Sequence, residues 1–169
     1  MTILKEGGLE LELPPGVIGI KFDDTSHGLS HCMKAVDFII EEPDKTLFIE
    51  FKDPDDPRAN PASRTKFISE LKIGKKDDAL IQKYRDSFIY RWAEDKVQKP
   101  VLYLILIATS QLDEAMLLAR CEELKRRLPA KGPPSGRWKK QLVHDCMICN
   151  IDTWNKHLSR YPIRRISVP

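Results

Sequence analysis

The chain has 169 residues, of which 41% are hydrophobic and 31% are charged, and its formal net charge is +3. This length suits a single domain, 1 to 169, with a buried core, and the hydrophobic content excludes a disordered chain. The longest apolar run, 101 to 108, is far below the roughly 20 residues of a membrane span, and Lys5 and Glu6 interrupt any signal peptide. We therefore expect a cytoplasmic protein that does not cross a membrane.

Two short strands are predicted near the N-terminus, over 9 to 13 and 17 to 22. Apolar and polar residues alternate in both segments, and a Pro-Pro-Gly sequence separates them. Residues 23 to 31 are polar and are expected to form a loop that leads into the next strand.

The stretch from Ala35 to Asp53, AVDFIIEEPDKTLFIEFKD, carries three charged side chains on two apolar segments joined by a Pro-Asp-Lys turn. Both segments are rich in β-branched and aromatic residues, which predicts a β-hairpin. Side chains alternate along a strand, so Glu50 and Lys52 share one face, and the hairpin would bring Asp37 opposite them. Buried charges are costly unless they pair with one another or bind a metal, so this segment is a candidate reaction centre.

A helix is predicted from Asp77, with an inward apolar stripe at spacings of three and four that ends at Trp92. Gln82, Lys83, Arg85 and Asp86 lie off this stripe, so any of them could reach the cleft or face solvent. Ser110 is expected to begin the next helix.

Between these two helices, residues 101 to 108 are apolar on both faces, which is typical of a central strand covered on either side. The order of strands and helices predicts an α/β fold with a mixed sheet.

This arrangement resembles the PD-(D/E)XK nuclease superfamily over roughly residues 17 to 109. Asp37 matches the first Asp of the family motif, and Glu50, Phe51 and Lys52 match (D/E)XK. The Pro that precedes the first Asp in the family is absent. The resemblance implies a restriction-endonuclease-like fold, which is a three-layer core with a central mixed β-sheet flanked by helices.

The resemblance also implies a Mg²⁺-dependent nuclease that hydrolyses phosphodiester bonds in DNA, of the restriction or repair type, with Mn²⁺ able to substitute. Mg²⁺ prefers oxygen ligands, which Asp37, Glu50 and the main-chain carbonyl of Phe51 would supply. Lys52 would hold the attacking water or stabilise the transition state. A related branch carries Gln-x-x-x-Tyr on the following helix, and Gln82 is assigned a supporting catalytic role although the spacing here differs.

Many members of the superfamily add an acidic residue from an N-terminal helix. The N-terminus of this chain alternates like strands instead, and the acidic residues available there are Glu6, Glu10 and Glu12.

The C-terminal part, 120 to 169, is basic, with 12 Lys and Arg against 4 Asp and Glu. Phosphate contacts supply most of the sequence-independent affinity for nucleic acid, so this charge suits a nucleic-acid partner, DNA rather than RNA by the resemblance, bound by a homodimer. The residues expected to contact it lie in or beside two exposed loops, and they are Arg58, Arg64 and Lys66 after the hairpin and Arg137, Lys139 and Lys140 in the Pro/Gly-rich loop.

An alternative stays open for the charged hairpin. Its three side chains could form a structural ion-pair network without a metal, because sheet edges commonly carry such charges. The chain would then be a catalytically inactive nucleic-acid-binding or assembly module on the same fold.

Overall fold

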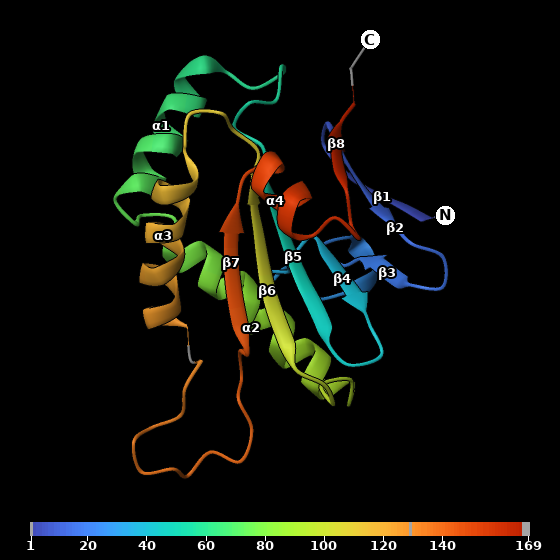
Figure 1. The fold of residues 1–169 in the computed structure, drawn as a ribbon. Helices are drawn as coiled ribbons and strands as arrows, with labels where there is room; N and C mark the ends of the chain where they lie inside the picture. The colour runs from blue at the N-terminus through green and yellow to red at the C-terminus, as the bar shows by residue number, and fades with distance from the viewer. Residues whose placement is uncertain (1, 129, 167–169) are drawn as a thin grey trace.

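The computed structural model describes residues 2 to 128 and 130 to 166, which form two β-sheets and four α-helices (Figure 1). The larger sheet has five strands in the order β3-β4-β5-β6-β7. Their bounds are β3 (Ile18–Lys21), β4 (Phe38–Glu41), β5 (Thr46–Lys52), β6 (Val101–Ile107) and β7 (Asp145–Cys149). The first three strands pair antiparallel and the last three pair parallel, which confirms the predicted mixed sheet and α/β class.

The smaller sheet joins the two ends of the described chain. Its strands are β1 (Thr2–Glu6), β2 (Leu9–Leu13) and β8 (Ile163–Arg165), which pair antiparallel in the order β1-β2-β8. The guanidinium of Arg165 donates two hydrogen bonds, of 2.6 and 2.7 Å, to the carboxylate of Asp53 just beyond β5. The small sheet is therefore tied to the carboxyl end of β5.

The predicted hairpin forms as expected. In the β4–β5 pair, Phe38 lies opposite Ile49 and Glu41 lies opposite Thr46, so extending the register by one residue brings Asp37 opposite Glu50. The turn is closed by a 2.9 Å hydrogen bond from the N–H of Glu42 to the carbonyl of Lys45.

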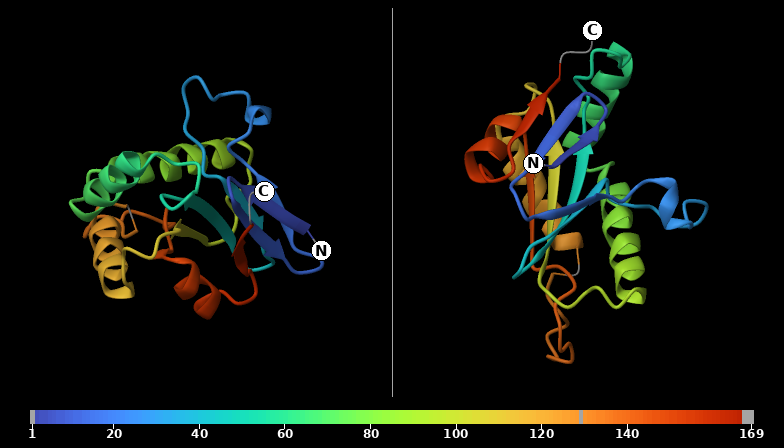
Figure 2. Two further views of the ribbon diagram at one scale, coloured as in Figure 1. Left: turned by 90° about the horizontal axis from the view of Figure 1, so that it is seen from above. Right: turned by 90° about the vertical axis from the view of Figure 1, so that its right-hand side faces the viewer.

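The five-stranded sheet separates two hydrophobic cores. The helices α1 (Pro61–Lys72), α2 (Asp77–Ala93) and α3 (Glu114–Arg127) pack on one face, while α4 (Ile151–His157) and the small sheet pack on the other (Figure 2). Alternate residues of β5 enter different cores, with Phe48 on the side of α1 to α3 and Leu47 on the side of α4. This alternation confirms that Glu50 shares the face of Phe48.

Two details of the helices differ from the predictions. The helix α3 begins at Glu114 rather than at Ser110, because the side chain of Asp113 caps it by accepting a 2.8 Å hydrogen bond from the N–H of Met116. Trp92 does not face inward but is 69% exposed. The inward position of that last turn is taken by Arg91, which forms a 2.6 Å ion pair with Glu41.

No helix within residues 2 to 128 and 130 to 166 combines the length and the apolar character needed to cross a membrane.

Replacing Trp154 by Ala should lower the free energy of unfolding by about 3 to 5 kcal/mol, because the substitution leaves a large cavity in the core under α4. Trp154 is fully buried, and its indole N–H donates a 2.7 Å hydrogen bond to the carbonyl of Tyr161. Denaturant unfolding would measure the change, with Trp92→Ala as the matched control. The exposed control should change the free energy by no more than about 0.5 kcal/mol. Equal effects of the two substitutions would contradict this core.

Candidate metal centre

The hairpin holds two carboxylates at its buried end. Asp37 directly precedes β4 and is 3% exposed, whereas Glu50 lies within β5 and is fully buried. One oxygen of Asp37 accepts a 2.6 Å hydrogen bond from the main-chain N–H of Phe51, which fixes this carboxylate across the hairpin. The amine of Lys52 contacts Glu50. The structure thus brings Asp37, Glu50 and Lys52 together.

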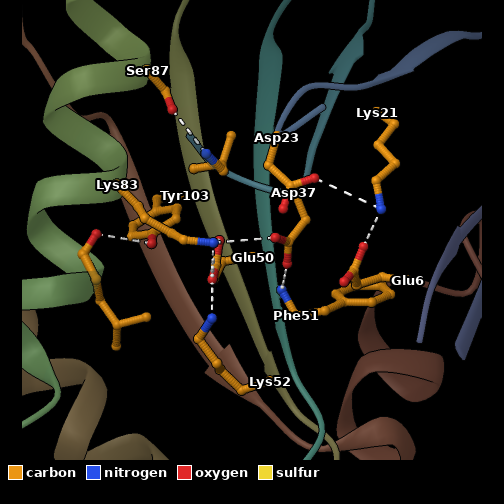
Figure 3. A network of polar contacts seen from close by, with 12 residues as sticks. Glu6, Lys21, Asp23, Asp37, Glu50, Phe51, Lys52, Lys83, Ser87 and Tyr103 are labelled. Carbon is orange, nitrogen blue, oxygen red and sulfur yellow. Dashed lines mark hydrogen bonds and ion pairs between the residues drawn. The ribbon is translucent and has the colours of Figure 1, made fainter. Parts of the chain in front are cut away.

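A second amine joins the two carboxylates. Lys83 Nζ, on α2, lies 3.2 Å from Asp37 Oδ1 and 2.7 Å and 2.9 Å from the two oxygens of Glu50 (Figure 3). Burial opposes the charge on Lys83, but the neighbouring Glu50 and Asp37 outweigh it and raise its pKa. Lys83 therefore acts as a cation shared by both acids.

Hydrogen bonds on either side of α2 explain why Lys83 reaches this position. On the hairpin side, the carboxylate of Asp86 accepts a 2.8 Å hydrogen bond from the N–H of Lys34, and Ser87 Oγ accepts a 2.9 Å one from the N–H of Val36. On the sheet side, the hydroxyl of Tyr103 donates a 3.0 Å hydrogen bond to the carbonyl of Leu80. Residues three and four apart share a helix face, so a helix anchored at 86 and 87 turns residue 83 toward the same segment, which leads into β4.

Two further acidic residues lie on the other side of Asp37. The N–H of Phe22 donates a 2.8 Å hydrogen bond to the carbonyl of Asp37, which places Asp23 beside it. Glu6, Asp23 and Asp37 each have an oxygen within 4.8 Å of the others. Lys21 contacts Glu6 and lies 3.7 Å from Asp23. Among the acidic residues noted at the N-terminus, Glu6 is the one that reaches this centre.

The centre holds more carboxyl groups than amines. Four carboxyls, those of Glu6, Asp23, Asp37 and Glu50, share only the amines of Lys21, Lys52 and Lys83 within the part of the chain that the structure describes.

Burial and crowding of the carboxyl groups raise the pKa of two of these acids. Burial, followed by repulsion from Asp37, raises the pKa of Asp23 to about 6 and that of Glu50 to about 7. The Oδ1 atom of Asp23 is buried and accepts no hydrogen bond from any described residue. An additional cation would lower the two raised pKa values and give the Oδ1 atom of Asp23 a partner.

The donor set suits a hard divalent cation. Mg²⁺ takes an octahedron of oxygens at about 2.0 to 2.1 Å, which places those oxygens roughly 3 to 4 Å apart. Glu6, Asp23 and Asp37 approach that spacing, since their oxygens lie within 4.8 Å of one another. Asp37 is common to this group and to the pair with Glu50, so it is the central candidate ligand. The metal-binding role of the Phe51 carbonyl stays a prediction, and the N–H of Phe51 is the group that contacts Asp37.

Gln82, which the sequence predicts as a supporting catalytic residue, is exposed, and its amide lies 3.5 Å from the carboxylate of Asp86. The residue of α2 that contacts the acids is Lys83 instead. The sequence shows both side chains off the apolar stripe of the helix, and periodicity alone does not distinguish them.

The first group of predicted nucleic-acid contacts lies near the carboxyl end of β5. Arg58 forms a 2.7 Å ion pair with Asp56, and Arg64 donates a 2.8 Å hydrogen bond to the carbonyl of Pro54. Lys66 is exposed on α1. Two of these three side chains therefore already hold the loop after β5.

The second group, Arg137, Lys139 and Lys140, is exposed at the other end of the sheet. Their loop precedes β7, which runs parallel to β6 and β5, so it lies beside the amino ends of these strands, whereas Lys52 lies at a carboxyl end (Figure 1). Lys139 and Lys140 border a hollow of about 670 Å³ together with Trp92. This hollow is separate from the acidic centre.

Comparisons of the chain with protein-family models, with curated proteins and with solved structures found no match. The geometry of the centre therefore carries the functional argument.

Replacing Lys83 by Met should lower the free energy of unfolding by roughly 3 kcal/mol, because Asp37 and Glu50 would lose their shared cation. Millimolar Mn²⁺ should recover part of this loss by binding the folded state. Denaturant unfolding with and without Mn²⁺ measures both effects, and Lys72→Met, at an exposed position of α1, is the control. If the two variants behave alike, Lys83 does not balance the acidic pair.

Manganese binding should depend more on Asp37 than on any other acid of the centre, since Asp37 belongs to both groups of oxygens. The electron paramagnetic resonance signal of free Mn²⁺ can be followed in titrations of Asp37→Asn, Glu50→Gln and Asp23→Asn. We expect the weakest binding from Asp37→Asn and no change from Asp44→Asn, a 74% exposed control. Unaltered binding by Asp37→Asn would rule out this centre.

Proposed function

We propose that the chain is a metal-dependent nuclease that hydrolyses phosphodiester bonds in DNA. One observation supports this most: Asp37, Glu50 and Lys52 converge at the buried end of one hairpin, with more carboxyl groups around them than amines. Such a set combines oxygen ligands for a hard cation with an amine for a phosphate, which is what phosphodiester hydrolysis requires.

The architecture agrees with a restriction-endonuclease-like fold, which we include in the proposal. The mixed five-stranded sheet lies between a layer of three helices and a layer formed by α4 and the small sheet. The choice of DNA as substrate rests on the resemblance to the PD-(D/E)XK superfamily.

Each side chain of the centre has a distinct role in the proposed reaction. Asp37, with Glu50 or with Asp23 and Glu6, would hold Mg²⁺ or Mn²⁺, which when bound lowers the pKa of a water and neutralises phosphate charge. Lys52, whose side chain is 34% exposed, would donate hydrogen bonds to the phosphate as negative charge develops on it. Lys83 would keep the two buried carboxylates oriented and partly neutralised.

A second candidate function follows from the same ion pairs. Both oxygens of Glu50 and one oxygen of Asp37 already have amine partners. A centre balanced by its own lysines would suit a catalytically inactive module that binds nucleic acid or takes part in an assembly.

The purified protein should cut DNA in Mg²⁺ or Mn²⁺, and EDTA should stop the reaction. Asp37→Asn, Glu50→Gln and Lys52→Met should each reduce the cleavage rate by at least about 100-fold, as expected when charge stabilisation at a reacting phosphate is lost. Gel assays on labelled plasmid and linear DNA would measure the rates.

Two matched controls separate this centre from ordinary surface charges. Glu123→Gln and Lys72→Met alter exposed Glu and Lys residues on α3 and α1, and both should cut like the unsubstituted protein. DNA binding without cleavage would favour the inactive module, whereas cleavage that survives Lys52→Met would place the chemistry elsewhere.

A further inference from the structure

A hollow of about 260 Å³ opens directly beside the acidic centre, between α1 and α2. Four lysines line it, and they are Lys34, Lys52, Lys76 and Lys83. Among the residues that the structure describes, no acidic side chain lines this hollow. Lys52 and Lys83 are the two amines that contact Glu50, so these two lysines lie between the carboxyl groups and the hollow. The centre therefore has an acidic side and a basic side.

The two remaining lysines do not serve the acidic centre. Lys34 is exposed, and its side chain forms no ion pair with a described residue. Lys76 is held at the edge of the hollow by a 2.7 Å ion pair with Glu70, and its amine lies 5.5 Å from the centre of the Phe67 ring. An ammonium group has three donors, so each lysine can donate to an anion in the hollow while it keeps its present partner.

Apart from the amide of Gln82, the remaining wall of the hollow is apolar. Phe67 comes from α1, Leu80 from α2 and Ile107 from the end of β6, and Leu80 and Ile107 are almost completely buried. At about 260 Å³ the hollow is slightly below the roughly 300 Å³ at which pockets for small ligands typically start, so it has room for one nucleotide at most. Amines above an apolar wall suit a phosphate attached to a sugar and base.

We propose that this hollow binds one nucleotide of the substrate strand, the one next to the cleaved bond, with its phosphate on the lysines and its base or sugar against Phe67, Leu80 and Ile107. That the nucleotide lies next to the cleaved bond rests on the proposed nuclease function, whereas the binding of a nucleotide in the hollow is independent of that function. Because the space admits one nucleotide, the nucleotide that enters it is unpaired at that position. Lys34 and Lys76 are then positioning residues for the substrate strand.

Thymidine 5′-monophosphate tests the subsite directly. Calorimetric titration in EDTA, which removes any contribution from a metal, should show saturable binding of the nucleotide, weaker binding of inorganic phosphate and none of thymidine. Lys34→Gln and Lys76→Gln should each weaken nucleotide binding about fivefold or more, as expected for the loss of a charge-assisted hydrogen bond. Lys75→Gln, an exposed lysine adjacent to Lys76 that does not line the hollow, should bind like the unsubstituted protein.

Several results would overturn the proposal. They are equal binding of phosphate and nucleotide, no saturable binding at millimolar nucleotide, and equal losses in the Lys75 and Lys76 variants. Circular dichroism of each variant confirms folding. The cleavage assay separates this subsite from the nuclease function, because a protein that binds the nucleotide with the expected lysine dependence but cuts no DNA keeps the subsite and loses the nuclease. In a protein that cuts, Lys34→Gln and Lys76→Gln should raise KM for single-stranded DNA more than they lower kcat.

Discussion

The burial of Glu50 is the constraint on which the rest of the site depends. A carboxylate without solvent exposure is costly unless cations and hydrogen bonds compensate for its lost hydration. Lys52 provides compensation from its own strand and Lys83 provides it from α2. Because the second amine comes from a helix, the charge balance of the centre requires correct docking of that helix on the sheet. Stability and the proposed chemistry thus rest on the same contacts.

Much of the fold follows from local sequence patterns, because a hairpin depends on residues that are close along the chain. Alternating side chains and a turn placed Asp37, Glu50 and Lys52 together correctly, and the apolar run at 101 to 108 identified the central strand. The prediction of which helix residues face inward was less accurate. Spacings of three and four led to Trp92, whereas the inward row of α2 ends at Arg91, whose charge is balanced by Glu41.

The remaining members of the centre depend on tertiary contacts that no local pattern contains. Lys83 reaches the acids because Asp86 and Ser87 hydrogen-bond to the main chain at Lys34 and Val36, about fifty residues earlier. Asp23 and Glu6 arrive through the pairing of β3 with β4 and the packing of β1 beside β3. Their sequence neighbourhoods resemble those of ordinary surface acids, and only the assembled sheets distinguish them.

The anchoring of α2 has a consequence for dynamics. Lys83, Asp86 and Ser87 lie within two turns of one helix, so a rigid shift of that helix would withdraw the amine from the acids and release the main chain before β4 at the same time. Contact of the Lys83 amine with the acids and local opening of the main chain at Lys34 and Val36 would then be thermodynamically linked. Amide hydrogen exchange at these two positions would report, from outside the centre, whether Lys83 is engaged.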